Sequence, residues 1–576
     1  MKLTGGEIVA RALAEEGVAH TFGIPGTHNI ELYDALGASE SVTPVLVTDE
    51  QSASFMADGL WRASWRLGCV NVVPGAGLTH AMSGIAEAFM DNVPMLVLGC
   101  GIRRDMEKAY QLHDVDQQAM VAPVCKATFL PRTGEELYAD LREACRIAQA
   151  PPGGPVFVEV PANLYLFKHD VSLGEANGGD GPRGATPDAA AVSHAAELVR
   201  ASRHPLLYVG AGCAGATDLV LALAEALEAP VSTTFQGKGV FPEPHPLFLW
   251  PGFGRAAPPF AQAVAGQCDL TLAIGVRFSE VGTGSYGLEP RGPLVHVDID
   301  PDVPGRNHPA AVAATADAGQ FIAALLEELS GDTRQRDESL RERIRSGHAE
   351  VWDGWLSSVG GPGVTPAHLL RSVQRLYGPD TIFTTDSGNG TFLAMECLRL
   401  EEPGKFLAPV DYSCMGYAVP AALGARLARP DCPVVALAGD GAFLMTGLEI
   451  LTAVRESLGV VILVLRDREL AQISQFQDVA FNRKVASVLP DFDLEAIASA
   501  TGAGFLALES DDRVEEVLLR ADAKAARGRP VLVDVAIDYS RKTYFTRGVV
   551  KANLSRLPLG DRVRFVGRAL TRKVTG

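Results

Sequence analysis

The 576-residue sequence lacks the features of secreted, membrane and disulfide-rich proteins. Its nine cysteines, an odd number, form no Cys-x-x-Cys pair, which argues for reduced thiols and against a disulfide framework or a zinc site. The first seven residues contain no apolar segment typical of a signal peptide, and no apolar run is long enough to span a bilayer. Positive charge is scarce, because 51 Lys and Arg face 69 Asp and Glu, for a net charge of −18. We therefore expect a soluble, cytoplasmic protein with neither a membrane nor a nucleic-acid partner.

The residues that are present suit large buried cores. Hydrophobic residues make up 47% of the chain and charged residues 21%, and the length predicts three or four domains. Strand-like apolar runs alternate with helical stretches, which implies parallel sheets covered by helices on both faces. In the first part of the chain these runs are 21–24, 45–47, 70–73, 95–98 and 156–160.

Two Gly-rich stretches without periodicity, 172–189 and 359–363, indicate linkers between domains. We therefore predict an α/β fold with three doubly wound parallel-sheet domains. The last stretch is basic and could pack over an acidic surface, although a solvated face is the favoured interpretation. The predicted boundaries are 1–171, 190–345 and 363–539, followed by a basic C-terminal tail at 540–576.

The stretch 434–477 carries the strongest chemical pattern. A strand-type run ends in Gly439-Asp440-Gly441, an amphipathic helix follows, and a second buried strand ends at Asp467. Parallel strands in such a βαβ unit place both acidic ends on the same edge of the sheet. The helix has one apolar face made of Leu444, Leu448, Leu451 and Val454.

This arrangement suits a diphosphate and a metal ion. The turn glycines let a diphosphate approach the backbone, and the helix N-terminus favours its charge. Two carboxylates beside it suit Mg²⁺, which shares oxygen ligands with substrate phosphates. Gly-Asp-Gly alone is equally compatible with an ordinary strand-helix turn, but the second acidic strand end favours the site.

A second glycine pattern, Gly210-x-Gly212-x-x-Gly215, follows the strand at 206–209. A dinucleotide site would need an acidic residue at the next strand end, and the strand at 230–234 supplies none. A structural turn is therefore favoured over a nucleotide site.

The first part of the chain offers three further loops. A strand ends in Glu50 at the start of a helix, a position that in isolation is typical of a surface carboxylate favoured by the helix dipole. Ile24-Pro25-Gly26-Thr27 and the loop from Gly75 to His80 follow other strands. These loops, the Gly-Asp-Gly stretch and the segment around Met415 resemble motifs of the thiamine-diphosphate-dependent enzymes, in the acetolactate synthase and pyruvate oxidase branch. They also occur along the chain in the same order as in that family.

The resemblance covers about residues 3–539 and implies pyrimidine-binding, central and diphosphate-binding domains. It implies that Glu50 acts on the aminopyrimidine, that Met415 wedges between the two cofactor rings, and that Asp440, the side chain of Asp467 and the carbonyl of Glu469 bind Mg²⁺. A Met in the core is the alternative for Met415. The implied cofactor-binding residues are Pro25, Gly26, Glu50, Gly77, His80, Asn389, Gly390, Thr391, Ser413, Met415, Gly439, Asp440, Gly441, Ala442, Asp467, Glu469 and Leu470.

The sequence departs from the family pattern at several positions. Arg466-Asp467 replaces the usual Asn pair, and the added negative charge should tighten the metal and oppose the diphosphate. Gly390 replaces a usual His. Acetolactate synthases and pyruvate oxidases carry FAD in the central domain; this chain keeps Arg277 but lacks the second Arg expected near Val281, so FAD is doubtful.

The implied substrate pocket also differs. Asp49 replaces the usual His before the glutamate, His113 stands in place of a Gln, and Phe476 replaces a Trp that helps to select the acceptor. His113 could act as general acid or base, or could be a surface histidine. The extra imidazole suggests a different acceptor, or a proton in place of one. The implied pocket residues are Thr27, His28, Leu112, His113, Gln472, Ile473 and Phe476.

Three functions follow as hypotheses. The first is decarboxylation of a 2-oxo acid followed by carboligation to a second carbonyl compound, as in acetolactate synthase, with Glu50 and His113 as catalytic residues. The second is simple decarboxylation. The third is a noncatalytic scaffold with a degraded cofactor site, against which the retained Glu50, Met415 and Asp440 argue. In the family the residue matching Glu50 serves the cofactor of another subunit, so we expect at least a homodimer.

Overall fold

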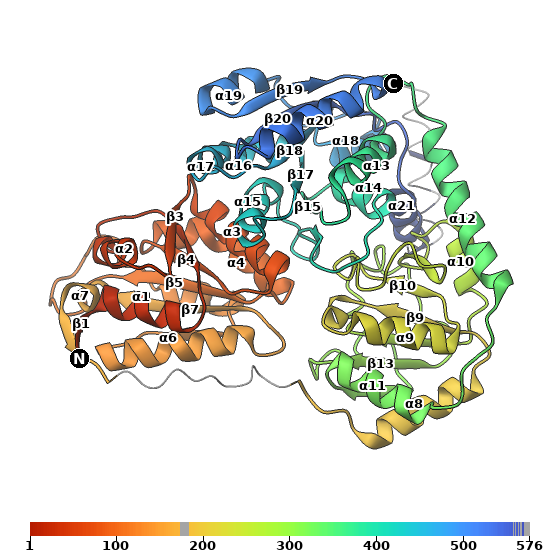
Figure 1. Cartoon of the computed structure of the whole chain (residues 1–576), viewed down its shortest axis with the longest axis horizontal. Helices are drawn as coiled ribbons and strands as arrows, with labels where there is room; N and C mark the ends of the chain where they lie inside the picture. The colour runs from red at the N-terminus through yellow and green to blue at the C-terminus, as the bar shows by residue number, and fades with distance from the viewer. Residues whose placement is uncertain are drawn as a thin grey trace.

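The computed structural model describes residues 1–172 and 184–556, together with 558, 560, 562, 564, 567 and 568. Within these residues the chain forms three six-stranded parallel sheets and one two-stranded antiparallel sheet (Figure 1). The predicted α/β fold class with three parallel sheets is confirmed. No helix among the described residues is both long and apolar enough to cross a membrane.

The first sheet has the order β3-β2-β4-β5-β7-β6, and all its neighbouring strands are parallel. Successive residues alternate between its two faces, so Leu96 and Leu98 face one core while Val97 faces another. One face packs on α1, α2 and α6, and the other on α3 and α4. The strands are β2 (His20–Gly23), β3 (Thr43–Leu46), β4 (Gly68–Val72), β5 (Met95–Gly101), β6 (Ala127–Phe129) and β7 (Pro155–Pro161), and the helices are α1 (Gly5–Glu15), α2 (Ile30–Gly37), α3 (Glu50–Ser64), α4 (Ala76–Met90) and α6 (Gly134–Gln149).

The central sheet has the order β11-β10-β9-β12-β13-β14. The chain runs outward in one direction from β9 and in the other from β12, so the crevice between them is the point where ligands of such sheets bind. The strands are β9 (Pro205–Val209), β10 (Val231–Thr233), β11 (Phe248–Pro251), β12 (Leu270–Ile274), β13 (Leu294–Asp298) and β14 (Val312–Thr315). Its helices include α8 (Ala189–Ala201), α9 (Thr217–Leu227), α11 (Ala318–Glu328) and α12 (Glu338–Leu356).

The third sheet has the order β16-β15-β17-β18-β20-β19 and contains the predicted βαβ unit, with β17 and β18 parallel. The helix predicted between these two strands is broken into α16, the 3₁₀ turn η3 and α17. Its strands are β15 (Ile382–Thr385), β16 (Phe406–Leu407), β17 (Val434–Gly439), β18 (Val461–Arg466), β19 (Gly504–Leu508) and β20 (Val531–Ala536). The helices used below are α14 (Asn389–Cys397), α15 (Ala418–Ala428), α16 (Asp440–Thr446), η3 (Gly447–Glu449), α17 (Ile450–Arg455) and α18 (Ala471–Phe481).

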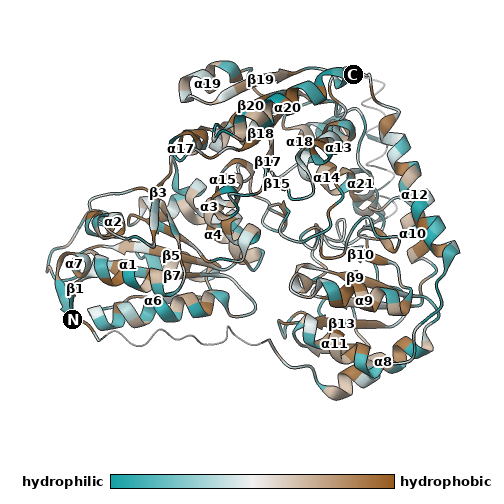
Figure 2. Ribbon diagram, viewed as in Figure 1, coloured by the Kyte–Doolittle hydropathy of each residue, from teal (hydrophilic) through white to brown (hydrophobic). Residues whose placement is uncertain are grey.

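Three of the four residues of the apolar face predicted for this segment do not point into the protein, whereas the fourth, Val454, is half-buried and packs against the core. Leu444, Leu448 and Leu451 are 46%, 59% and 43% exposed, whereas Phe443 and Ile450 are buried. These three leucines, with the 55% exposed Met445, are named the leucine face below. Figure 2 shows the brown interior strands of the sheets and the mixed colouring of the helices around them.

The first and third sheets meet through α3 and α15, which lie side by side in Figure 1. Two glycines make this contact close. A methyl group at Gly59 of α3 would lie 2.3 Å from the carbonyl oxygen of Ala421, and one at Gly424 of α15 would lie 2.0 Å from that of Met56. Each helix thus presents a glycine to the backbone of the other.

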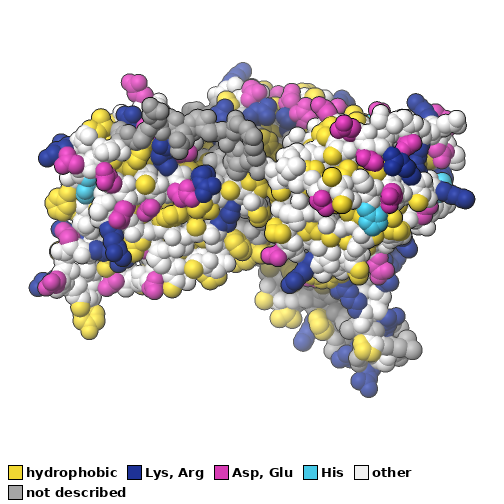
Figure 3. All heavy atoms as spheres, turned by 90° about the horizontal axis from the view of Figure 1, so that it is seen from below, with side chains coloured by type: hydrophobic (Ala, Val, Ile, Leu, Met, Phe, Trp, Pro, Cys, Tyr) yellow, Lys and Arg dark blue, Asp and Glu magenta, His cyan; other side chains and the backbone are white. Residues whose placement is uncertain are grey.

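The basic C-terminal stretch is not a solvated tail over its first half. Residues Tyr544–Arg556 form helix α21, whose Gly548 packs against the backbone of Ala256 in the central sheet region. Asn553 lies 3.0 Å from the Ser285 hydroxyl, which donates to its Oδ1. Acidic and basic side chains are interspersed with apolar ones on the face shown in Figure 3. Most of the linker predicted at 172–189 and most of the tail beyond residue 556 lie outside the described residues.

Candidate active site

Glu50 lies at the carboxyl edge of the first sheet, as the first residue of α3 after β3. Its side chain is buried and its Oε2 lies 3.3 Å from Nδ1 of His80. The sequence predicted a loop from Gly75 to His80, but α4 begins at Ala76, so Gly77 and His80 lie at the start of this helix. A methyl group at Gly77 would lie 3.1 Å from Oε1 of Glu50, so this glycine leaves room beside the carboxylate. The structure therefore brings Glu50, Gly77 and His80 together.

Two further histidines reach the same edge. His28 follows β2, His113 follows β5, and their ring centroids lie 5.5 Å apart with the rings at 72°. The Cβ position of Gly75, in the loop after β4, lies 3.7 Å from Nδ1 of His113. Loops after four adjacent strands thus build one edge, as the carboxyl ends of parallel strands dictate.

The acidic site lies at the carboxyl edge of the third sheet. Asp440 starts α16 and accepts hydrogen bonds from the backbone N–H groups of Gly441 (2.8 Å) and Arg468 (2.7 Å). Burial and then the Asp440 carboxylate raise the pKa of Asp467 to about 7, and burial also raises the pKa of Asp440. Two carboxylates held this close favour a cation between them. The donor set fits Mg²⁺, as oxygen ligands at a helix N-terminus beside a glycine turn.

The Met415 segment is held against this turn. A methyl group at Gly441 would meet Leu470 at 2.6 Å and Met415 at 3.7 Å, so these three residues converge. Asp386, buried at the end of β15, accepts from the backbone N–H groups of Gly416 (2.7 Å) and Ala418 (3.0 Å). Sequence reasoning missed this role of Asp386, and burial raises the pKa of its carboxyl to about 6.

Other residues predicted for the cofactor site lie in the loops around Asp386. Thr391 donates its hydroxyl to the Asp386 carbonyl (2.7 Å), and the hydroxyls of Ser413 and Ser387 lie 2.8 Å apart. Asn389 and Gly390 begin α14 in the same loop, directly after the turn that follows β15. The structure therefore brings the predicted loops at 386–391, 413–415, 439–442 and 467–470 to one edge.

The departure at Arg466 has a structural explanation. Its guanidinium pairs with Asp491 (2.7 Å) and Asp534 (3.2 Å) and lies over the ring of Phe492, 4.6 Å from the ring centroid. Arg466 therefore fills a place beside β20. Its positive charge also lowers the pKa of Asp440, against the larger effect of burial, and so offsets part of the charge that Asp467 adds.

The predicted substrate residues are divided between the two edges. Gln472, Ile473 and Phe476 lie on α18, and Ile473 is 49% exposed. A methyl group at Gly388 would lie 3.9 Å from Oε1 of Gln472, which places α18 beside the loop at 386–391. Thr27, His28, Leu112 and His113 lie in loops after strands of the first sheet. Leu112 is 67% exposed. Among the described residues, no hydrogen bond or ion pair joins Glu50 to the acidic edge.

Two contacts that the sequence did not predict join the sheets near these edges. Glu449 of η3 accepts from the backbone N–H (3.2 Å) and the hydroxyl (2.6 Å) of Thr48, two residues before Glu50. Glu87 of α4 accepts from the backbone N–H of Cys414 (3.0 Å), next to Met415. Each carboxylate is fully buried and links one edge to the other.

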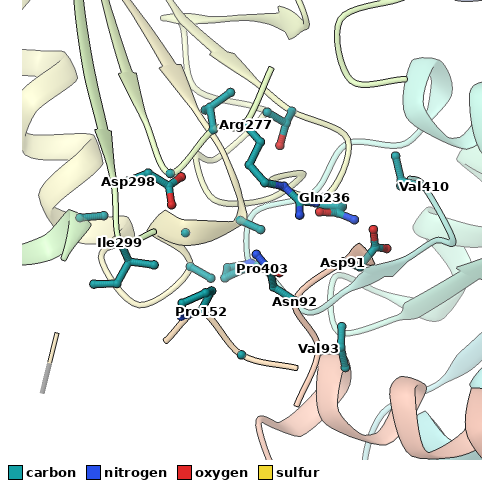
Figure 4. A pocket seen from close by; sticks show the side chains of 18 of the residues that line it. Asp91, Asn92, Val93, Pro152, Gln236, Arg277, Asp298, Ile299, Pro403 and Val410 are labelled. Atoms are coloured by element: carbon teal, nitrogen blue, oxygen red, sulfur yellow. The ribbon is translucent and has the colours of Figure 1, made fainter. Parts of the chain in front are cut away.

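A cavity of 360 Å³ lies at the crevice between β9 and β12 of the central sheet (Figure 4). Asp91, Asp298, Asp317 and Asp411 line it, and both lining guanidinium groups are already paired, Arg277 with Asp411 and Arg62 with Asp58 and Asp91. Within the described lining, the residues therefore fit the diphosphate of FAD poorly.

The glycines of the 210–215 stretch serve packing at this crevice. A methyl group at Gly210 would lie 2.0 Å from the carbonyl oxygen of Gly275, and one at Gly212 would lie 2.8 Å from its Cα. The close contact between the two loops therefore requires both glycines, as the structural-turn interpretation predicts.

Three models of known protein families match the chain, one for each region that contains a six-stranded sheet. Residues 3–120 match the thiamine pyrophosphate enzyme N-terminal TPP binding domain, residues 192–325 its central domain, and residues 386–535 its C-terminal TPP binding domain. The fold and the two edges therefore define a thiamine-diphosphate-dependent enzyme.

Curated relatives match along nearly the whole chain. Acetolactate synthase isozyme 3 large subunit of Escherichia coli is 29% identical over 563 residues, covering 94% of this chain and 96% of that protein. Acetolactate synthase of Mycobacterium bovis is 30% identical, covering 93% and 88%. An acetolactate synthase large subunit of Parasynechococcus marenigrum is 31% identical, covering 94% and 89%. The chain belongs to the thiamine pyrophosphate enzymes, in their acetolactate synthase branch.

Proposed function

We propose that the chain decarboxylates a 2-oxo acid with thiamine diphosphate and Mg²⁺ and joins the remaining acyl unit to a second carbonyl compound. The observation that carries this proposal is the pair of edges, one with Glu50 beside a glycine loop and one with Asp440 and Asp467 at a glycine turn. The relatives named acetolactate synthase, which match along nearly the whole chain, support the same chemistry.

Each edge has its own part in the proposed reaction. The bound cofactor would supply an electron sink for the acyl unit. The side chains of Asp440 and Asp467 and the carbonyl of Glu469 would hold Mg²⁺, and Met415 with Leu470 would support the cofactor rings. Glu50 would exchange a proton with the aminopyrimidine.

We also propose a homodimer in which Glu50 of one protomer serves the acidic edge of its partner. The leucine face supports this arrangement, because it lies on α16, η3 and α17 directly after the Asp440 turn and exposes four large apolar side chains. Exchange of Leu448 for Glu should yield monomers in sedimentation analysis, whereas the same exchange at Leu519, 53% exposed on a helix (Val514–Ala525) outside this face, should not.

A simple decarboxylase is the second candidate. The close pair of His28 and His113 favours it, since an imidazolium can donate a proton where an acceptor carbonyl would otherwise react.

The test begins with calorimetric titration of metal-stripped protein with thiamine diphosphate, with and without Mg²⁺. We expect binding that depends on the metal. A panel of 2-oxo acids is then assayed for CO₂, and the products are analysed for acyloin and aldehyde. Failure to bind the cofactor would overturn the proposal and favour a partner-binding scaffold, and release of aldehyde alone would favour the second candidate.

A further inference from the structure

We propose that His28 and His113 act as one acid–base pair that protonates the carbon from which CO₂ has left, and so set the share of aldehyde among the products. This inference rests on the proposed decarboxylation. It adds His28 as a catalytic residue, and it makes the histidine pair the point where protonation and carboligation compete.

The two imidazoles are brought together by two different loops of the first sheet. Their centroids lie 5.5 Å apart in an edge-to-face arrangement, and Nδ1 of His28 also lies 3.2 Å from the hydroxyl of Thr27. His113 has a left-handed backbone with φ of 65°, a conformation that costs free energy in a residue other than glycine. Its carbonyl oxygen accepts from the N–H of Val115 at 2.9 Å, which helps to fix this conformation.

The pair lies next to Glu50. A methyl group at Gly75, the N-cap of α4, would lie 3.7 Å from Nδ1 of His113, and one at Gly77, in the first turn of α4, would lie 3.1 Å from Oε1 of Glu50. Two residues of chain span at most about 7 Å, so His113 and Glu50 lie near the same short segment. Both imidazoles are half-buried and therefore partly accessible to a substrate. A proton donor near Glu50 would lie beside the proposed reaction site.

The surroundings favour the neutral form of His28. Burial and then the neighbouring His113 lower the pKa of His28, so this imidazole loses its proton more readily than a free one. The other charged groups near the pair are Asp114 and Asp116 on the His113 loop, both exposed, and the Glu50–His80 pair beyond the glycine loop. The neutral His28 can then accept the next proton from water and pass it to His113.

The chemistry balances without a further reactant. The bond between the carbonyl carbon and the carboxylate breaks, CO₂ leaves, and the electron pair stays on the carbonyl carbon. If that carbon takes a proton from His113, a C–H bond forms and an aldehyde is released, with one proton drawn from solvent overall. If the same electron pair attacks a second carbonyl, a C–C bond forms instead.

The experiment uses the holoenzyme with its best 2-oxo acid and an added aldehyde acceptor. The variants are His28→Gln, His113→Gln and the double variant, with His194→Gln, exposed on α8, as the matched control. CO₂, aldehyde and acyloin are measured over a range of pH. Cofactor binding by calorimetry verifies that each variant is folded.

We expect His113→Gln to lower aldehyde release about 10²–10⁴-fold while acyloin formation falls much less. His28→Gln should shift the pH profile of aldehyde release, and the double variant should lose no more than His113→Gln, because the residues act as a unit. An unchanged aldehyde share, or losses that add, would overturn the inference. If the wild-type protein releases no CO₂ from any 2-oxo acid, the proposed function fails as well.

A second measurement does not depend on turnover. Nuclear magnetic resonance titration of the His28 imidazole should show a higher pKa in His113→Gln than in wild type, because the neighbouring positive charge is gone. An unchanged pKa of His28 would count against a shared proton.

Discussion

The first and third sheets have the same topology but opposite chemistry. Numbered along the chain within each sheet, the strand order is 2-1-3-4-6-5 in both, as β3-β2-β4-β5-β7-β6 and β16-β15-β17-β18-β20-β19. The helix after the second strand is α3 in one and α15 in the other, and these two helices pack on each other through Gly59 and Gly424. The first and third sheets thus make equivalent contacts with each other through the corresponding helices.

The corresponding loops carry different groups. After the third strand, one sheet has Gly75-Ala76-Gly77 beside Glu50, and the other has Gly439-Asp440-Gly441 beside Asp467. After the fourth strand, one has His113 and the other has Asp467. Under the proposed function, the edge of the first sheet would present imidazoles and a carboxylic acid for proton transfer. The edge of the third sheet would present carboxylate oxygens for a metal ion and backbone N–H groups at a glycine turn for a diphosphate. The fold sets where the loops lie, and their residue types set what they bind.

A change at the carboxyl edge of the first sheet should stop the reaction and leave the binding of thiamine diphosphate intact. Exchange of Glu50 for Gln should lower CO₂ release about 10²–10⁴-fold, because the aminopyrimidine loses its proton partner. Calorimetry should show nearly unchanged affinity for thiamine diphosphate with Mg²⁺. Full activity of this variant would remove Glu50 from the mechanism.

A change at the carboxyl edge of the third sheet should first weaken cofactor binding. Exchange of Asp440 for Ala removes a proposed charged metal ligand and should weaken cofactor affinity about tenfold to a hundredfold. The control is Asp431→Ala, an exposed residue before β17, whose affinity should match the wild type. Equal affinity in both variants would argue against the assigned metal site.

The contact between the edges should respond to pH through Glu87. Burial and then Asp91 raise the pKa of Glu87 to about 9, and its Oε1 has no hydrogen-bond partner among the described residues. The folded chain keeps a proton that the unfolded chain releases above pH 4.5, so Glu87 lowers stability progressively from about pH 4.5 to 9.

Exchange of Glu87 for Gln removes this titration. The stability gained over wild type should grow with pH, by at most about 1.4 kcal/mol per pH unit. Chemical denaturation at pH 6, 7 and 8 measures the difference, with the exposed Glu197→Gln as control. A difference that stays constant with pH would show that Glu87 is already ionised.

The two glycines of the contact between α3 and α15, Gly59 and Gly424, give the test with the smallest expected effect. Gly59→Ala and Gly424→Ala should each destabilise the chain by about 1–3 kcal/mol, because the added methyl meets backbone of the opposite helix. Gly37→Ala, with open space around its Cβ position, should be neutral. If only one of the two interface variants is destabilised in urea titration, the two halves are less alike than their contacts indicate.

Periodic features were predictable from the sequence, and contacts across domains were not. The strands and the βαβ unit at 434–465 follow from apolar runs and turn residues, and the approach of Asp440 to Asp467 follows from parallel pairing. The role of Asp386 depends on N–H groups 30 and 32 residues away in the sequence. That of Glu87 depends on Cys414, 327 residues away. No local pattern encodes such contacts.

The sequence pattern predicted the surroundings of two segments wrongly. The leucine face has the periodicity of a core-facing helix, but an apolar stripe does not state whether its partner is the same chain or another one. The basic stretch after residue 540 conceals the small residues Gly548 and Ala552, through which α21 docks on the central region. In both cases the missing information is the shape of the opposing surface.

The leucine face has a consequence for how the enzyme behaves on dilution. If a second copy covers it, burial of these side chains stabilises the complete active site only while protomers are paired, and pairing follows mass action. Turnover per milligram should then fall as the protein is diluted below the dissociation constant of the dimer, and should recover on concentration. The concentration of the enzyme itself would thereby act as a regulator of its specific activity.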